Sequence, residues 1–234
     1  MATRHERAGL SREKVLDAAL ELVDQVGVDG LSMRKLGAAL GVEAMTLYHY
    51  VPNKDALLSG LVERTATRAF TVDPAAGWQA MLRGFTAGFR RELLAHPGVV
   101  PLVATRPVTT PSALRELETA VAILRAAGFG TREAFHVVNT VATFTTGHCL
   151  AEVDPPGAAP PALAVPDPAA LPHLAEAVRD GLGTPADHEA RFAFALDALI
   201  DGFARMLARR SPDEGGRAST ASAQGDHEGG PASA

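Results

Sequence analysis

The chain consists largely of segments in which apolar residues recur every three or four positions, the spacing of a helix with one buried face. Ser11 can cap the first of these segments, and Gly27 and Gly30 can end it and turn the chain. Its apolar stripe consists of Val15, Ala18, Leu22, Val23 and Val26. Because exposed apolar surface is unfavourable in water, we expect the next segment to pack on this stripe.

Two short helices joined by a tight turn are predicted next, within residues 31–54. Ser32 can cap a helix from about Met33 to Leu40, Gly41 supplies left-handed backbone to end it, and a second helix begins at about Glu43. Gly37 removes a side chain where the two backbones approach. The inner faces meet at four apolar residues, Leu36, Leu40, Val42 and Leu47. The pattern predicts a helix-turn-helix, although an ordinary helical hairpin has the same pattern.

Further stripes predict a helix from Asn53 until Asp73 and Pro74 break it, and then helices over 78–95, 112–127, 131–152, 169–182 and 186–209. Prolines make 153–172 an expected loop. We therefore predict an all-α fold. Its parts are a flexible arm (1–10), a three-helix helix-turn-helix domain (11–54), a linker helix with a larger helical domain (55–209) and a disordered tail (210–234).

Composition excludes few classes of protein, but its charge, cysteine content and apolar runs each limit the function. The formal net charge of −5 argues against a generally basic nucleic-acid coat, so any DNA affinity must come from charges segregated to one face. The single cysteine, Cys149, excludes a disulfide within one chain and fits a reducing compartment. No stretch approaches the unbroken apolar length of a membrane span, and we expect a cytoplasmic protein.

The outward face of the second short helix suits the DNA major groove, because it carries small, hydroxyl and aromatic side chains. We predict base-edge contacts from Ala44, Met45 and Thr46. Phosphate or sugar contacts are predicted for Arg34, Tyr48, His49, Tyr50 and Lys54, although Arg34 could instead read a guanine. Whether the N-terminal arm contacts DNA stays open.

The run LSMRKLGAALGVEAMTLYHYVPNKDALL resembles the DNA-binding domain of the tetracycline-repressor (TetR) family of transcription regulators. FRRELLAHPGVVPLVATRP, LRAAGF and FTTGHCLAE resemble the ligand-binding domain of the tetracycline repressors themselves, so the similarity extends from about Ser11 to Leu207. The resemblance implies a regulator, most simply a repressor, that binds double-stranded operator DNA and responds to a small molecule.

Ten residues stand at positions that resemble the drug-contacting positions of tetracycline repressors: Phe70, Phe85, Phe89, Leu102, Thr105, Leu117, Ala120, Phe135, Val138 and Ala142. In those repressors a histidine binds the magnesium carried by the drug, and Leu102 stands in its place. Phe70, Phe85 and Ala120 replace expected polar contacts. An apolar site rejects a polar chelate whose atoms lose water without gaining partners. We predict a hydrophobic or aromatic effector, with no cofactor and no magnesium; the alternative is a filled core without a ligand.

Helices 131–152 and 186–209 carry apolar faces wider than one small core needs. Pairing each with its two-fold mate would give a four-helix dimer interface, which is where the family dimerises. A dimer also suits DNA reading, because two helices about 34 to 36 Å apart read both halves of a palindrome. The alternative is that both faces belong to the internal core.

The sequence contains few features that would indicate metal binding or catalysis. His148 and Glu152 lie one helical turn apart, but Cys149 points about 100° away from its neighbour, so we predict no metal site. No nucleophile motif, phosphate loop or repeated metal-ligand spacing indicates an enzyme. The alternatives left open are a ligand-independent DNA-binding protein and, with less support, an enzyme with an appended helix-turn-helix.

Overall fold

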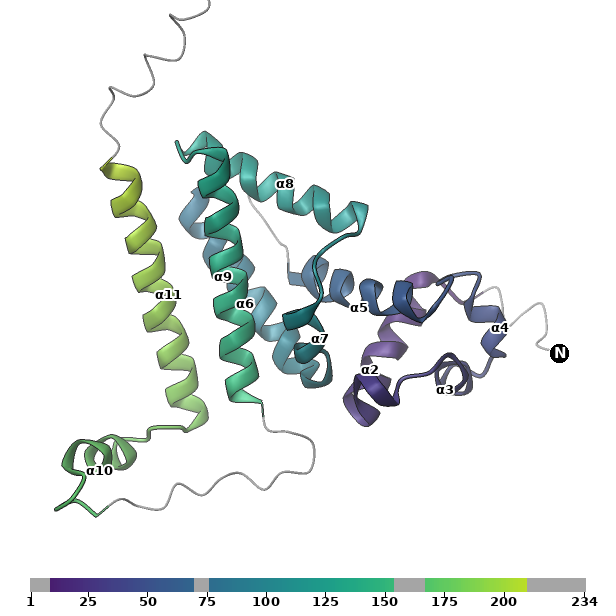
Figure 1. The fold of residues 1–234 in the computed structure, drawn as a ribbon, viewed down its shortest axis with the longest axis horizontal. Coiled ribbons are helices and arrows are strands. Elements are labelled where there is room, and N and C mark those ends of the chain that lie inside the picture. The colour runs from purple at the N-terminus through teal and green to yellow at the C-terminus, as the bar shows by residue number, and fades with distance from the viewer. Residues whose placement is uncertain (1–8, 70–75, 154–166, 210–234) are drawn as a thin grey trace, which may run out of the picture.

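A computed structural model describes residues 9–69, 76–153 and 167–209, and all regular structure within these ranges is helical (Figure 1). This confirms the predicted all-α fold. The predicted arm before Gly9, the tail after Arg209 and residues 154–166 of the predicted loop lie outside the described residues. Within the described residues, no helix is long and apolar enough to cross a bilayer.

The first four helices are α2 (Arg12–Gly30), α3 (Met33–Ala39), α4 (Ala44–Leu47) and α5 (Lys54–Ala69). They are followed by α6 (Gly77–Ala95), the 3-10 turn η2 (Pro97–Val99), α7 (Val100–Thr105) and α8 (Pro111–Ala126). The last are α9 (Thr131–Glu152), α10 (Pro172–Arg179) and α11 (Pro185–Ala208).

Local chemistry accounts for the ends of the first helices. The side chains of Ser11 and Ser32 accept hydrogen bonds from the backbone N–H groups of Lys14 and Lys35, each at 3.2 Å, as expected of N-caps. Gly27 has a φ of 71° and breaks the helical geometry of α2 where the sequence predicted its end, although helical hydrogen bonding continues to Gly30. Gly41 has a φ of 68° and turns the chain between α3 and α4.

The turn between α3 and α4 depends on a close backbone approach at Gly37. A Cβ at this position would lie 2.8 Å from the carbonyl oxygen of Val42 and 3.1 Å from the backbone nitrogen of Ala44. Both atoms belong to the backbone and cannot move aside cheaply. The glycine therefore fixes how α4 crosses α3.

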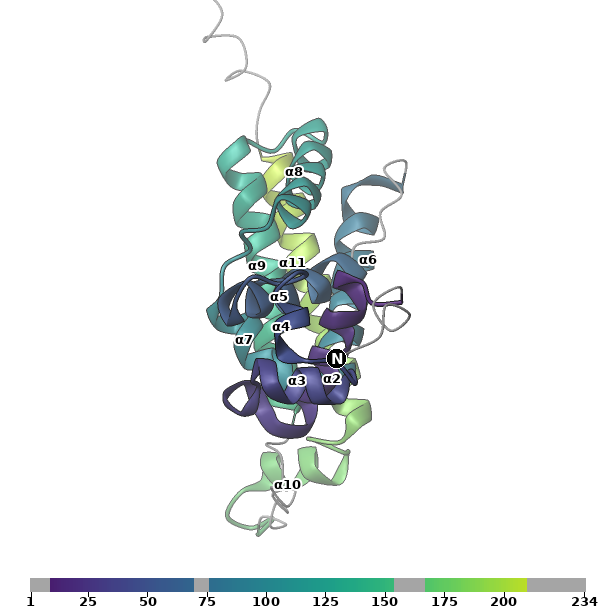
Figure 2. The same cartoon turned by 90° about the vertical axis from the view of Figure 1, so that its right-hand side faces the viewer.

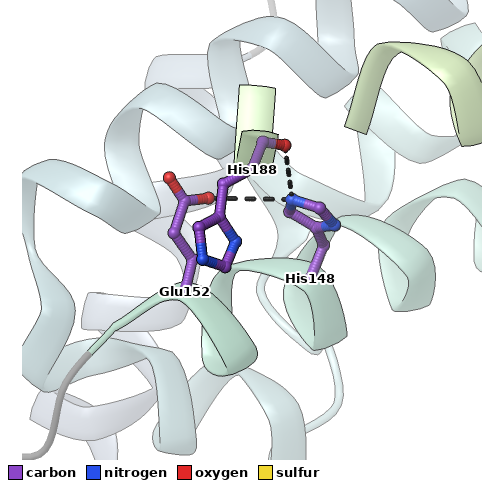
Figure 3. A group of neighbouring side chains, drawn as sticks. All are labelled: His148, Glu152 and His188. Carbon is purple, nitrogen blue, oxygen red and sulfur yellow. Dashed lines mark hydrogen bonds and ion pairs between the residues drawn. The ribbon is translucent and has the colours of Figure 1, made fainter. Parts of the chain in front are cut away.

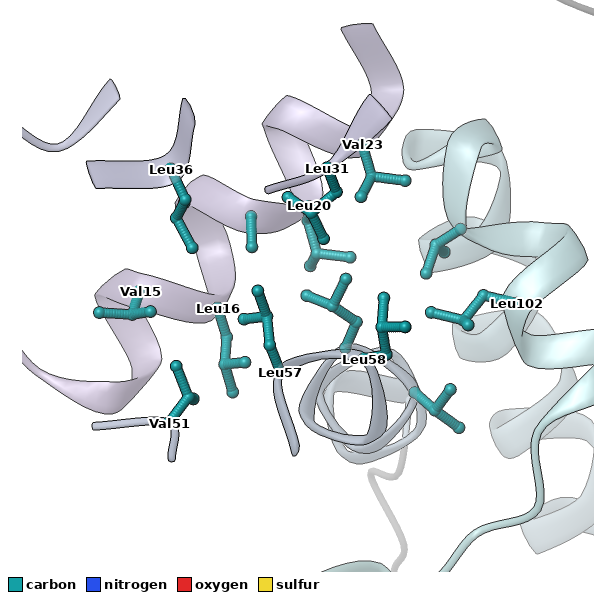
Figure 4. Packing of buried hydrophobic residues seen from close by; sticks show 14 of the residues in the cluster. Val15, Leu16, Leu20, Val23, Leu31, Leu36, Val51, Leu57, Leu58 and Leu102 are labelled. Carbon is teal, nitrogen blue, oxygen red and sulfur yellow. The ribbon is translucent and has the colours of Figure 1, made fainter. Parts of the chain in front are cut away.

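One hydrophobic core connects the helix-turn-helix to the rest of the molecule. Leu16 and Leu20 of α2, Leu57 and Leu58 of α5 and Leu102 of α7 belong to the same buried cluster (Figure 4). The small module therefore does not pack by itself. A further close approach supports this, because a Cβ at Gly98 of η2 would lie 2.6 Å from the carbonyl oxygen of Val23 in α2.

The helices α6, α8, α9 and α11 form the larger body, on the far side of α5 from the helix-turn-helix (Figure 1). Figure 2 looks onto the end formed by α2, α3 and α4, with α9 and α11 behind it. A second buried cluster fills this body, including Trp78 and Leu82 of α6, Leu124 of α8 and Phe192 of α11. The α5 helix therefore joins the helix-turn-helix end to the body.

The α10 helix is shorter than the predicted helix over 169–182. Pro172 lies in its first turn, where a missing N–H costs nothing. A left-handed Gly181, with a φ of 98°, follows the residue that caps its end, Asp180. The observed helix is therefore shorter than predicted at both ends, because Pro172 and Gly181 set its bounds and the spacing of apolar residues does not reflect their backbone preferences.

Candidate DNA interface and ligand pocket

The α4 helix presents its outward face to solvent as the sequence predicted. Met45 is 70% exposed and Tyr48 41% exposed, while Leu47 is buried beneath them. Although α4 has only four residues, the backbone N–H of Val51 donates to the carbonyl of Leu47 at 2.9 Å. Helical hydrogen bonding therefore continues past Tyr48.

The other predicted DNA contacts surround this face unequally. Arg34, His49 and Lys54 are exposed, and Thr46 is half-buried. Ala44 and Tyr50 pack partly against the core, so their free surface is smaller than the sequence suggested. Lys54 is the first residue of α5, and the Asn53 side chain caps this helix by accepting from the Ala56 N–H at 2.8 Å.

Two acidic residues of α2, Asp17 and Asp24, contact the helices that follow in the chain, whereas Glu21 and Asp29 are exposed. Asp17 accepts hydrogen bonds from Arg64 at 2.9 and 3.1 Å and from Arg68 at 2.8 Å. Asp24 contacts His96 Nδ1 at 2.8 Å and accepts from the Gly98 N–H at 2.9 Å. These contacts tie α2 to α5 and η2, and they neutralise charge that would otherwise repel phosphate.

A cavity of about 540 Å³ lies in the body, walled by α5, α6, α8, α9, the end of α7 and the segment after it. Six of the ten predicted ligand residues line it: Phe85, Phe89, Leu117, Ala120, Val138 and Ala142. Phe85 and Phe89 stack with ring centroids 5.4 Å apart. The apolar walls and this volume suit a small organic molecule.

The remaining predicted ligand residues lie elsewhere. Leu102 is buried in the core shared with the helix-turn-helix. Thr105 uses its hydroxyl to donate to the Pro101 carbonyl at 2.9 Å, and Phe135 packs against the second core. None of these three lines the cavity, and Phe70 lies outside the described residues.

Several wall residues are absent from the sequence prediction, notably Arg106, Glu116, Asn139 and Thr143. Helical spacing places Asn139 and Thr143 one turn apart and beside Val138 and Ala142. This spacing could have indicated the two polar residues of α9. Nothing local indicates that Glu116 faces the cavity.

One wall residue of the cavity contacts the first turns of α5, next to Lys54, for which the sequence predicts a DNA contact. Arg106 lines the cavity, and its guanidinium donates to Asp55 at 2.6 Å and to Ser59 at 3.3 Å. Asp55 lies in the first turn of α5, beside Lys54. Arg106 therefore links the cavity wall directly to the first turns of α5.

A separate polar cluster joins α9 and α11. His148, Glu152 and His188 place one potential metal ligand atom each within 4.8 Å of one another (Figure 3). Each group already has a partner. The Arg90 guanidinium donates to both Glu152 oxygens at 2.8 and 2.9 Å, and His148 Nε2 donates to the His188 carbonyl at 3.1 Å.

The positive charges of two arginines make this cluster unfavourable for a divalent metal ion. Besides Arg90, Arg191 lies with its Nη2 2.8 Å from His188 Nδ1. Burial raises the pKa of the Cys149 thiol to about 11, so the neighbouring cysteine is a neutral thiol rather than a thiolate ligand. The cluster serves to pack α9 against α11.

Known proteins match both parts of the chain. Residues 15–61 match the bacterial regulatory proteins of the tetR family, and residues 71–207 match the tetracyclin repressor-like C-terminal domain. The chain is 37% identical over 204 residues to the class D tetracycline repressor protein of Escherichia coli, a match that covers 86% of this chain and 92% of that protein.

Solved structures agree. A possible TetR family transcriptional regulator from Streptomyces coelicolor A3(2) matches with a TM-score of 0.67 at 32% identity, covering 84% of this chain and 100% of that one. A TetR variant from Acinetobacter baumannii AYE, solved in complex with minocycline, matches with a TM-score of 0.64 at 28% identity, covering 85% and 98%. With its helix-turn-helix and its helical C-terminal domain both matched, the chain belongs to the tetracycline-repressor family of bacterial transcription regulators.

Proposed function

We propose that the protein is a homodimeric repressor that binds a palindromic operator and releases it when a mostly apolar small molecule occupies the cavity. The observation that carries this proposal is the Arg106 contact. A residue of the cavity wall holds Asp55 at 2.6 Å, directly beside Lys54 at the DNA face. Because its target is DNA, we place the protein in the cytoplasm, and we propose that it is a regulator and not an enzyme.

Release of the operator follows from a population shift. A ligand that prefers the arrangement unable to bind DNA by about 3 kcal/mol lowers operator affinity roughly a hundredfold. The α5 helix carries this change, because it meets the cavity at Val62 and Ala66 and begins at Lys54. A small tilt at the cavity would displace α4 and change the spacing of the two reading helices.

The effector we propose is more hydrophobic than a magnesium-bound tetracycline. The class D relative is named a tetracycline repressor, and the A. baumannii protein binds minocycline. In this chain apolar residues form most of the cavity wall, and Phe85 and Ala120 stand among them. A polar chelate would lose its hydration there without regaining hydrogen bonds.

We propose that dimerisation uses α9 and α11, through surface left uncovered in one chain. Phe194 is 77% exposed and Met206 59% exposed on α11. Phe194, Ala198, Gly202 and Met206 are each four residues apart and share one face. Among the described residues, and apart from its chain neighbours and the nearby backbone of α11 itself, no atom lies within 4 Å of a Cβ placed at Gly202. That face therefore has room for the helix of a second copy.

A gel-shift experiment tests this function. Operator DNA, isolated from a random pool by its retention on the protein, should be bound as a complex of two chains, and an apolar aromatic ligand that raises the melting temperature should release it. Operator binding that no stabilising ligand changes would favour a ligand-independent DNA-binding protein. Failure to retain any DNA would overturn the proposal.

A further inference from the structure

One charged side chain in the cavity wall is left without a partner. Glu116 of α8 lines the cavity among mainly apolar residues contributed by α5, α6, α8 and α9. Among the described residues, its carboxylate forms no hydrogen bond or ion pair. Glu116 is half-buried, so its carboxylate loses part of its hydration, which is unfavourable unless a positive charge lies nearby.

The other ionisable groups nearby do not supply that charge. Arg106 also lines the cavity, but Asp55 and Ser59 hold its guanidinium. Glu63 of α5 is 9% exposed and is held by Arg12 at 2.7 Å and by the Ser112 hydroxyl. The wall residues of α6 and α9 within the described residues are all non-ionisable. Glu116 therefore contributes uncompensated negative potential to the cavity.

The surroundings also make ionisation of this carboxyl costly. Burial raises the pKa of Glu116, and the nearby negative charge of Glu63 raises it further. The charge of a cation in the cavity would offset both effects, because it favours the ionised carboxylate. A perturbed carboxyl group in a cavity is a common mark of a functional site.

We propose that the effector is an amphiphilic cation, an apolar or aromatic body carrying one ammonium group that lies beside the Glu116 carboxylate. This inference rests on the proposed function, since it names the class of molecule that occupies the same cavity. The apolar walls hold the body, and Glu116 selects the charge. A neutral molecule of the same shape keeps only the first of these contributions.

The test uses two probes of matched shape on the purified full chain. One is the (6-phenylhexyl)trimethylammonium ion, and the other is its neutral isostere, in which a tert-butyl group replaces the trimethylammonium group. Titration calorimetry should show the cation binding about tenfold more tightly than the isostere, the size expected of a partly solvated charge pair. Crystal violet and its uncharged leuco form repeat the comparison on a wider aromatic body.

Variants separate charge from shape. In Glu116→Gln, the side chain keeps its size and loses its charge, so the cation and the isostere should bind equally well. Glu118→Gln changes an exposed carboxylate two positions along the same helix and should keep the tenfold preference. Because the quaternary cation does not titrate, its affinity for the unaltered chain should rise with pH through the pKa of Glu116 and stay flat in Glu116→Gln.

The outcomes distinguish the two proposals. Equal binding of cation and isostere to the unaltered chain, with release of operator by both, would overturn the cation inference and leave the apolar effector in place. Binding of neither member of either probe pair, with the operator retained throughout, would count against both. A cation preference that survives Glu116→Gln would assign the charge recognition to a different group.

Discussion

Lys54 and Thr46 lie at the same end of the molecule but have different relations to a bound duplex. Lys54 is exposed at the first turn of α5, where its ammonium opposes the positive end of the helix dipole and gains from a nearby phosphate. Thr46 lies on the half-buried outward side of α4. A phosphate contact carries no sequence information, whereas a base contact does.

We therefore expect Lys54→Ala to weaken binding to every DNA sequence by a similar factor and to lower the slope of log affinity against log salt by about one unit. Thr46→Val should instead change which operators are preferred. Fluorescence anisotropy over a salt series, with a small operator panel, measures both. If Lys54→Ala changed operator preference at unaltered affinity, the two roles would be reversed.

At the α9–α11 contact, His148 has a side chain only 6% exposed. Burial is the main cause that lowers its pKa, and Arg191 and Arg90 add to the effect. The unfolded chain therefore takes up a proton near the ordinary pKa of about 6.5, while the folded chain resists it. Stability should fall as the pH drops below that value.

Urea unfolding at about pH 7.5 and about pH 5.5 measures this loss, which His148→Gln should reduce because glutamine cannot titrate and can still donate to the His188 carbonyl. His173→Gln alters an exposed histidine on α10 and serves as the control. Identical pH dependence in the unaltered chain and in His148→Gln would show that the buried ring does not set it.

At the scale of elements, we propose that α5 is the mechanical connection between the cavity and DNA. Its two ends are tied by different contacts, since Arg64 and Arg68 hold Asp17 of α2 near its end, and Asp55 holds Arg106 near its start. The packing at Gly60, where a Cβ would lie 2.7 Å from Leu16, keeps α5 close against α2. A displacement of α5 therefore carries α2 with it.

Asp55→Asn should weaken this coupling, because Arg106 would lose its charged partner outside the cavity. We expect the ligand to bind with little change and to reduce operator affinity by about tenfold rather than about a hundredfold. Operator titrations with and without ligand give both values. Asp29→Asn, an exposed aspartate near the end of α2, should retain full coupling. Full coupling in Asp55→Asn would remove the Arg106 contact from the mechanism.

The elements themselves were largely predictable from the sequence. Apolar spacing, serine caps and the glycines at 27, 37 and 41 are local signals, and the caps and glycines have the predicted structural effect. The stripe predicted for the first helix is only partly right, because α2 buries Leu16, Ala19 and Leu20 beside Val15 and Val23 and leaves Val26 39% exposed. The contacts that define the sites were not predictable. Arg106 and Asp55 are 51 residues apart in the sequence, and His148 and His188 are 40 apart. A periodic pattern within one helix cannot predict that residues so far apart in the chain will be in contact.

The residues of the cavity were likewise predictable only in part. Phe85 and Val138 were predicted from a resemblance and line it, whereas Leu102, placed by the same resemblance, is core. Glu116 was missed, because a glutamate on an amphipathic helix ordinarily faces solvent. Only the packing of α8 against α5 and α9 makes it a wall residue.

At the scale of the whole molecule, the proposal depends on two chains acting together. One short reading helix gives little specificity, whereas a symmetric pair reads a repeated sequence. The exposed face of α11 that runs from Phe194 to Met206 belongs to the surface we assign to this pairing.

We expect Phe194→Glu to separate the dimer into single chains, because it would bury two charges in the interface without partners. Analytical ultracentrifugation at micromolar concentration measures the change, and operator affinity should fall with it. Leu114→Glu, at a residue 46% exposed on α8, should leave the dimer intact. Single chains in the unaltered protein would contradict the proposed assembly.

The most direct measurement is an unbiased selection of DNA bound from a random pool by the full chain. The account predicts enrichment of an inverted repeat, with half-sites roughly one helical turn (34–36 Å) or a multiple of it apart and two chains bound per duplex. Enrichment of a single unrepeated motif bound by one chain, or no enrichment at all, would contradict it.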